Sequence, residues 1–195
     1  MSDKNIILEK YKKNIYTSID VSSFFDYHDP LKIITTLIEH HEYKKTIIHN
    51  FIIILFSLGK HEIINKMESL YLNSFSNIYK EENSYAAFSA AITNNHIETV
   101  KYLLDKKVPF FNNSIELTIY RDNIVLLKLL LNNFSPLSDF YYTKYLLLSA
   151  DLKKTNFLSF FVLMPQFKEL SELKLSVINE SYEKEIRAIL NLSQF

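Results

Sequence analysis

His61 and Glu62 come closest in this chain to a catalytic motif. In zinc proteases two histidines four residues apart bind the metal from one face of a helix, and a glutamate beside the first histidine acts as a base. Here the second histidine position is occupied by Asn65, and an amide is a poor zinc ligand. Glu62 is better explained as an acid in the first turn of a helix, where the helix dipole favours a negative charge.

The remaining histidines are not predicted to bind a metal. His40, His41 and His49 lie close together in the sequence, but adjacent helical residues point about 100° apart. A zinc site needs three or four ligands around one ion. We expect His40 and His41 near the end of a helix that begins at Pro30, where a cation suits the helix dipole.

The amino acids that most enzyme motifs require are scarce. The chain has no cysteine and one glycine, Gly59, which excludes thiolate nucleophiles and cysteine zinc sites. Phosphate-binding loops and serine nucleophile elbows both need glycine-rich turns. The acidic pair Asp26 and Asp29 around His28 is typical of a polar turn. We therefore predict a protein that is not an enzyme and that has no metal and no cofactor.

The composition is that of a folded chain with balanced charge. Hydrophobic residues make up 48% of the 195 residues, too many for a disordered protein. Lys plus Arg and Asp plus Glu number 22 each, so the formal net charge is zero. Nucleic-acid binding draws most of its affinity from a basic excess. We therefore expect no nucleic-acid partner.

No segment of the sequence is predicted to enter a membrane. Residues Met1–Lys13 carry charges and lack the continuous apolar core of a signal peptide. The longest apolar run, Ile47–Leu58, contains His49 and Asn50 and is shorter than the roughly 20 residues of a membrane span. We expect a cytoplasmic protein without a membrane partner.

A helical pattern recurs along the chain. Ile97, Val100 and Leu103 fall at helical spacing. Asn94 and Asn95 precede them and can turn the chain, because asparagine tolerates the left-handed region. Sliding this unit along the sequence aligns six anchor positions: Ile34, Ile64, Val100, Leu127, Leu158 and Ile186. A period near 30 residues indicates stacked two-helix units that complete one another's core.

The clearest unit, Ala91–Val108, resembles an ankyrin repeat, which folds as a turn and two antiparallel helices over about 33 residues. It has the family's histidine in the inter-helix turn, its glutamate, its paired aliphatic residues and its Leu-Leu ending. Leu58–Ile64 is similar to the Gly-His-x-Glu segment of the family, with one inserted residue. The chain departs from the family at Ala86–Ser89, which replaces Thr-Pro-Leu-His, and at Lys107 and Asn133, which replace the glycine after the second helix.

The resemblance implies an all-α, ankyrin-like solenoid of about five to six degenerate helix-turn-helix repeats. It would form a single domain over residues 1–195, with a capping helix in residues 1–20 and a capping repeat in residues 171–195. His96 would bond to backbone and brace adjacent repeats. The Ser- and Asn-rich segment Asn73–Asn83 is the most loop-like part of the chain. The alternative is an irregular helical bundle, which is also all-α.

The resemblance also implies where a partner would bind. Ankyrin arrays meet other proteins with the concave face of their first helices and with the loop tips between repeats. The corresponding residues in this chain are Ala87, Ala90, Asn94, Phe110 and Phe111. Pro109 stiffens the last segment. If that segment is extended, the two phenylalanines point in different directions, so one can pack inward while the other faces a partner. The alternative is that both rings cover the top of the stack.

We therefore expect a non-catalytic module that binds another protein. Divergent ankyrin arrays occur in large DNA viruses and intracellular bacteria, so the resemblance implies interference with a host pathway in the host cytoplasm. The alternative is a stoichiometric inhibitor or immunity protein that blocks a toxin or an enzyme. In that case its gene would lie beside the gene of the toxin.

The repeat alignment makes Val100 and Leu127 equivalent core positions. Changing either to Asp buries an unpaired charge, which should cost several kcal/mol and unfold a marginally stable protein. Thermal unfolding followed by circular dichroism measures the loss. If both variants melt like the unaltered protein, the alignment is wrong.

Overall fold

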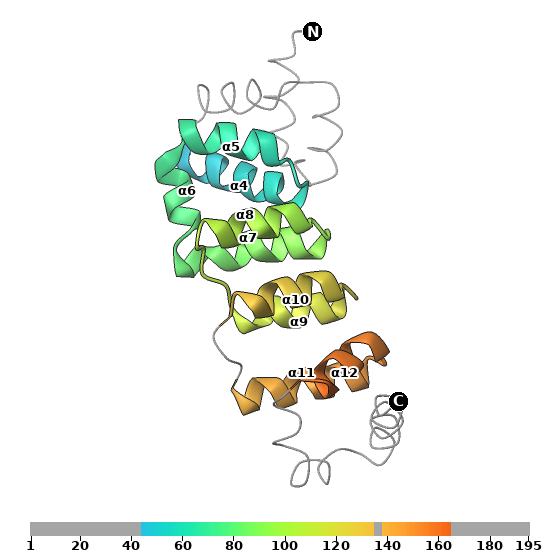
Figure 1. Ribbon diagram of the computed structural model, residues 1–195. Coiled ribbons are helices and arrows are strands. Elements are labelled where there is room, and N and C mark those ends of the chain that lie inside the picture. The colour runs from blue at the N-terminus through green and yellow to red at the C-terminus, as the bar shows by residue number, and fades with distance from the viewer. Residues whose placement is uncertain (1–43, 135–137, 165–195) are drawn as a thin grey trace. The chain divides into compact units, whose positions relative to one another are not determined.

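The computed structural model describes residues 44–134 and 138–164, and every regular element within them is a helix (Figure 1). The predicted all-α class is confirmed for this part of the chain. Several predictions lie outside the described residues, and they concern both capping segments, the anchors Ile34 and Ile186, and the residues Asp26, His28, Asp29, His40 and His41.

Contacts between residues divide the chain into two compact units, residues 1–114 and residues 115–195. The division falls inside helix α9 (Asn112–Tyr120). The single domain expected over residues 1–195 stays a prediction.

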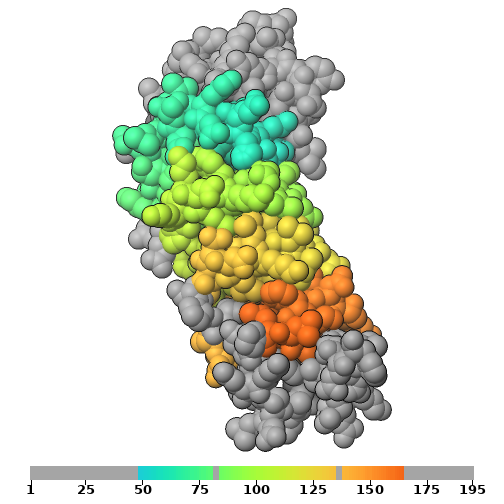
Figure 2. Space-filling view, viewed as in Figure 1, coloured from blue at the N-terminus to red at the C-terminus, as the bar shows by residue number. Residues whose placement is uncertain are grey.

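The described part of the first unit, from residue 44 onward, contains two helix pairs and one additional helix. The pairs are α4 (Lys44–Ser57) with α5 (His61–Leu70) and α7 (Glu81–Thr93) with α8 (Ile97–Asp105), and α6 (Leu72–Ile78) lies between them in sequence. The first helices of the two pairs, α4 and α7, pack against each other. In the space-filling view the side chains of α5 and α8 also meet along one face (Figure 2). The largest fully buried side chains here are Ile52, Leu55, Phe56, Ile64, Phe75 and Phe88.

The second unit contains the rest of α9, followed by α10 (Ile124–Asn132), α11 (Asp139–Asp151) and α12 (Thr155–Val162). Helices α11 and α12 form its best-packed pair. Tyr142, Tyr145 and Phe161 are fully buried between them. The hydroxyl of Tyr142 donates a hydrogen bond to the carbonyl oxygen of Phe161, which satisfies the one polar atom of that buried ring.

The turn inside each of these helix pairs has the same backbone geometry. One residue in every turn has a positive φ, and these residues are Gly59 (63°), Asn95 (59°), Asp122 (57°) and Lys153 (54°). In the second pair, the N–H of Asn95 donates to Ile92 and the N–H of His96 donates to Ala91, at 3.0 and 2.9 Å. The other three turns repeat this pattern. It is the Schellman motif, which gives donors to the last free carbonyl groups of a helix.

The predicted anchors occupy equivalent places after these turns. Ile64, Val100, Leu127 and Leu158 each follow the positive-φ residue of their turn by five positions. All four side chains are at most 1% exposed. The alignment made from the sequence is therefore confirmed at these four positions as a register of helix-turn-helix pairs.

The predicted loop at Asn73–Asn83 is wrong. Residues Leu72–Ile78 form α6, and α7 already begins at Glu81. Phe75 and Ile78, three residues apart, are both fully buried and hold this short helix against α4, α5 and α7. The Ser and Asn residues between them gave the segment a loop-like composition, and they occupy its outer side. The additional helix accounts for the long spacing between Ile64 and Val100.

The only glycine of the sequence, Gly59, has a left-handed backbone conformation and also leaves space for a neighbouring side chain. Gly59 has φ of 63°, and a Cβ added to it would lie 2.6 Å from Nδ1 of His96. Nε2 of that histidine lies 2.8 Å from the carbonyl oxygen of Ser57 and donates to it. His96 thus contacts the backbone of the preceding helix pair, as the resemblance implied.

Two lysines occupy left-handed positions at which glycine is preferred. Lys107, two residues after the end of α8, has φ of 55°, and Lys153 has φ of 54°. Both side chains are exposed. Because a left-handed residue with a Cβ is strained by roughly 1–2 kcal/mol, changing either lysine to Gly should stabilise the fold by up to about 1 kcal/mol once unfolded-state entropy is subtracted.

Gly59→Ala is the matched opposite change. It should destabilise by more than about 1 kcal/mol, because the new Cβ is strained and must also displace His96. Urea unfolding at neutral pH measures all three variants. A lower stability for both lysine-to-glycine variants would contradict this account of the turns.

Candidate functional site

An exposed pair of aromatic rings lies at the end of the α7–α8 helix pair. The ring of Phe111 is 36% exposed and the ring of Tyr85, on α7, is 42% exposed. Their centroids are 6.5 Å apart in an edge-to-face arrangement. This Tyr85–Phe111 pair is a surface feature of the first unit.

The segment that carries Phe111 is anchored on both sides. The N–H of Val108 donates to the carbonyl oxygen of Leu103 at 3.0 Å, and its side chain is buried. The ring of Phe110 lies 5.4 Å from the fully buried ring of Phe88. Phe110 therefore packs inward while Phe111 is more exposed.

The other predicted contact residues lie along α7 with unequal access to solvent. Ala87 is fully buried and offers no surface to a partner, because it faces the core with its neighbour Phe88. Ala90 is half-buried, and Asn94 is exposed with its amide donating to the Ala90 carbonyl oxygen at 2.9 Å. Asn94 lies nine residues along α7 from Tyr85, about 13 Å at the rise of a helix. The structure therefore gathers Phe110 and Phe111 beside the start of α7 and leaves Asn94 at its far end.

Tyr85 was not singled out from the sequence. It lies one helical turn before Phe88, so helical spacing alone places the two on neighbouring faces. Tyr85 meets Phe111 because the chain after α8 runs back to the start of α7. No local sequence pattern predicts this.

A second group of polar side chains joins three helices of the first unit. The carboxylate of Glu68, on α5, accepts hydrogen bonds from Tyr79, Tyr102 and Lys106 at 3.2, 2.8 and 2.7 Å. The two tyrosine hydroxyls lie 2.9 Å apart. Tyr79 follows α6, and the other two donors belong to α8 and its end. We name these four residues the Glu68 cluster.

The protonation states of the Glu68 cluster favour the hydrogen bonds that link its helices. Burial raises the pKa of Glu68, but the hydrogen bonds from Lys106 and Tyr102 and the charge of Lys106 outweigh it and leave the pKa below its ordinary value of 4.5. Burial also raises the pKa of Tyr79 and Tyr102. The carboxylate is therefore held ionised and the phenols neutral, and an ionised carboxylate engaged by three donors is a weak base.

His61 and Glu62 both lie in the first turn of α5. The ring of His61 meets the ring of Tyr102 edge to face, with centroids 5.9 Å apart. Glu62 lies in the first turn of α5, as predicted. Within residues 44–134 and 138–164, no group of three or more histidine or acidic side chains is placed to hold a metal ion.

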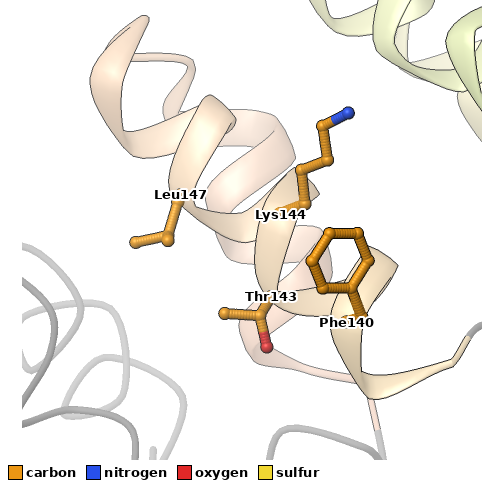
Figure 3. Close-up of a pocket in the computed structure, with 4 residues that line it drawn as sticks. All are labelled: Phe140, Thr143, Lys144 and Leu147. Atoms are coloured by element: carbon orange, nitrogen blue, oxygen red, sulfur yellow. The ribbon is translucent and has the colours of Figure 1, made fainter.

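The second unit exposes one side of α11. Phe140, Thr143, Lys144 and Leu147 line a groove of about 500 Å³ along one side of α11 (Figure 3). Phe140, at 70% exposed, has the most exposed aromatic ring of the described residues, and the sequence gave no reason to choose it. In the adjacent aromatic pairs Tyr141–Tyr142 and Phe160–Phe161, one ring of each pair, Tyr142 and Phe161, lies in the core.

No protein-family model, no curated protein and no solved structure matches this chain. Among the described helices, none is both long enough and apolar enough to cross a membrane.

The lowered pKa of Glu68 predicts how stability changes in acid. Its contribution is complete above the ordinary pKa of 4.5 and is lost as the pH falls through the lower pKa of the folded state. Glu68→Gln should therefore destabilise the protein at pH 7, and its difference from the unaltered protein should shrink as the solution is acidified below pH 4.5. Urea unfolding over a pH series measures this. Glu62→Gln, at an exposed position of the same helix, serves as the control, and a Glu68→Gln difference that is unchanged in acid would contradict the assignment.

Proposed function

We propose that this protein is a non-catalytic module that binds another protein, built as an ankyrin-like array of helix pairs. The observation that carries the proposal is the Tyr85–Phe111 pair, two exposed aromatic rings in contact at the end of the α7–α8 pair. Aromatic side chains are favoured anchors of protein interfaces, because each buries a large area with few rotatable bonds.

The turn geometry supports the ankyrin-like part of the proposal. Two-helix units closed by a left-handed residue recur through the described residues. The contact between His96 and the carbonyl oxygen of Ser57 is of the kind that the family uses between neighbouring repeats. In such an array the loops after the second helices form one edge, and the Val108–Phe111 segment belongs to that edge.

The rigidity of the Tyr85–Phe111 pair supports its use in binding. Phe111 follows Pro109, whose ring fixes its own φ, and its neighbour Phe110 is packed on Phe88. A side chain already held in place loses less conformational entropy when a partner covers it. Leu70, which is 62% exposed, lies at the end of α5 outside this ring pair and provides a comparison.

The proposal is tested by capture of partners with matched variants. The tagged protein is isolated from its natural setting, and co-purified proteins are identified by mass spectrometry for the unaltered chain, Tyr85→Ala, Phe111→Ala and the control Leu70→Ala. We expect a partner that is lost from both aromatic variants and kept by the control. With that partner purified, each aromatic change should weaken binding at least about tenfold, as hot-spot residues do.

Phe110→Ala separates packing from binding. Because this ring is half-buried against Phe88, its loss should lower stability by about 1–3 kcal/mol, whereas Phe111→Ala, at the more exposed ring, should lower stability by less. If folded Tyr85→Ala and Phe111→Ala variants capture the same proteins as the unaltered chain, the ring pair is not the interface.

A further inference from the structure

Helix α9 is shorter than the first helices of the other three described pairs. It has 9 residues, whereas α4, α7 and α11 have 14, 13 and 13. A helix this short is marginal by itself, so its stability depends on the side chains that it buries. The boundary between the two compact units also falls inside α9, between Ser114 and Ile115. Helix α9 therefore gains less support from its own length than its three counterparts do.

The buried positions of α9 are unusually polar. In all four first helices, the residues eight and four positions before the positive-φ residue of the turn are buried. These residues are Phe51 and Leu55 in α4, Ala87 and Ala91 in α7, Ser114 and Thr118 in α9, and Tyr145 and Ser149 in α11. Because a buried hydroxyl group must be dehydrated, the two positions in α9 contribute less to hydrophobic stabilisation than those in α4 and α7.

One of the two hydroxyl groups in the core of α9 has no hydrogen-bond partner. The hydroxyl of Thr118 donates to the carbonyl oxygen of Ile115 at 2.7 Å. The hydroxyl of Ser114 is fully buried and makes no hydrogen bond with the described residues. A buried polar group without a partner costs the free energy of its dehydration. Opening of α9 returns this hydroxyl to water and removes that cost.

The start of α9 also holds Phe111 in place. The N–H of Ser114 donates to the carbonyl oxygen of Phe111 at 2.8 Å. The two preceding apolar residues are anchored on the α7–α8 pair, Val108 through its bond to Leu103 and Phe110 through its ring contact. The position of the Phe111 ring therefore depends on α9, whereas the segment before it does not.

We infer that α9 opens locally while α7, α8 and α11 stay folded, and that this opening separates Phe111 from Tyr85. If the proposed function holds, on which this step rests, the binding surface is complete only while α9 is folded. A partner that covers both rings then stabilises α9, because a ligand shifts an equilibrium toward the state that it binds. Elements that move when a protein binds are drawn from its least stable parts.

Hydrogen exchange of the full chain, without any partner, tests the local opening. We expect the amides of α9 to exchange at least about tenfold faster than those of α7, under conditions that keep the protein folded. Helix α7 is the matched comparison, because it has Ala87 and Ala91 where α9 has Ser114 and Thr118. Equal exchange rates in the two helices would overturn the inference.

The variant Ser114→Ala tests the cause of the opening. It removes the hydroxyl that has no partner, and it installs the residue that α7 has at this position. Exchange in α9 should slow by about tenfold or more, whereas the higher helix propensity of alanine alone would slow it about threefold at most. Ser89→Ala makes the same substitution on α7 and should leave α9 unchanged. A Ser114→Ala chain in which α9 exchanges at the original rate would contradict the inference.

The variant Tyr85→Ala tests whether the ring pair is linked to α9. Because the pair forms only when α9 is folded, removing the ring on α7 should speed exchange in α9 by about threefold or more. Leu70→Ala, outside the pair, is the control and should have no such effect. Exchange in α9 that is unaffected by Tyr85→Ala would overturn the link. These measurements use the free chain, so their failure is distinct from a failure of partner capture, which would overturn the proposed function.

Discussion

A helix can reverse direction within three residues only if one of them takes a positive φ, because this lets its last carbonyl groups find donors while the chain turns back. In the described residues this requirement is met by Gly59, Asn95, Asp122 and Lys153. Three of the four carry a Cβ and are held in a strained conformation by the helices they join. The turn sets the register of everything that follows, because the residue five positions later points into the core in every pair. In the first pair the absence of a Cβ also leaves room for the His96 ring to reach Ser57.

Polar contacts then tie the additional helix α6 into the first unit. The Glu68 cluster joins α5, the end of α6 and α8 through one carboxylate that accepts from three donors. Such a group is costly to bury unless its hydrogen bonds are made, so the cluster favours one arrangement of these helices over others. The buried apolar side chains Phe75 and Ile78 also hold α6 in place. The segment Leu72–Ile78 is therefore a packed helix and not a loop.

The Tyr85–Phe111 pair is apolar and is supported by a ring packed on the core, so it can contribute buried area at low entropic cost.

The sequence by itself determined the all-α class, the turn at Asn94 and Asn95, the anchors Ile64, Val100, Leu127 and Leu158, and the contact of His96 with backbone. These follow from helical periodicity and from the conformational preferences of single residues, which act over a few positions of the chain, and in the case of His96 from a family resemblance. Only the tertiary structure decided that Leu72–Ile78 is a helix, that Ala87 is buried, that Tyr85 meets Phe111 and that Glu68 binds Tyr79 and Tyr102. Each of these depends on which helix faces join and how deeply a segment is covered, and residues far apart in the chain settle that together.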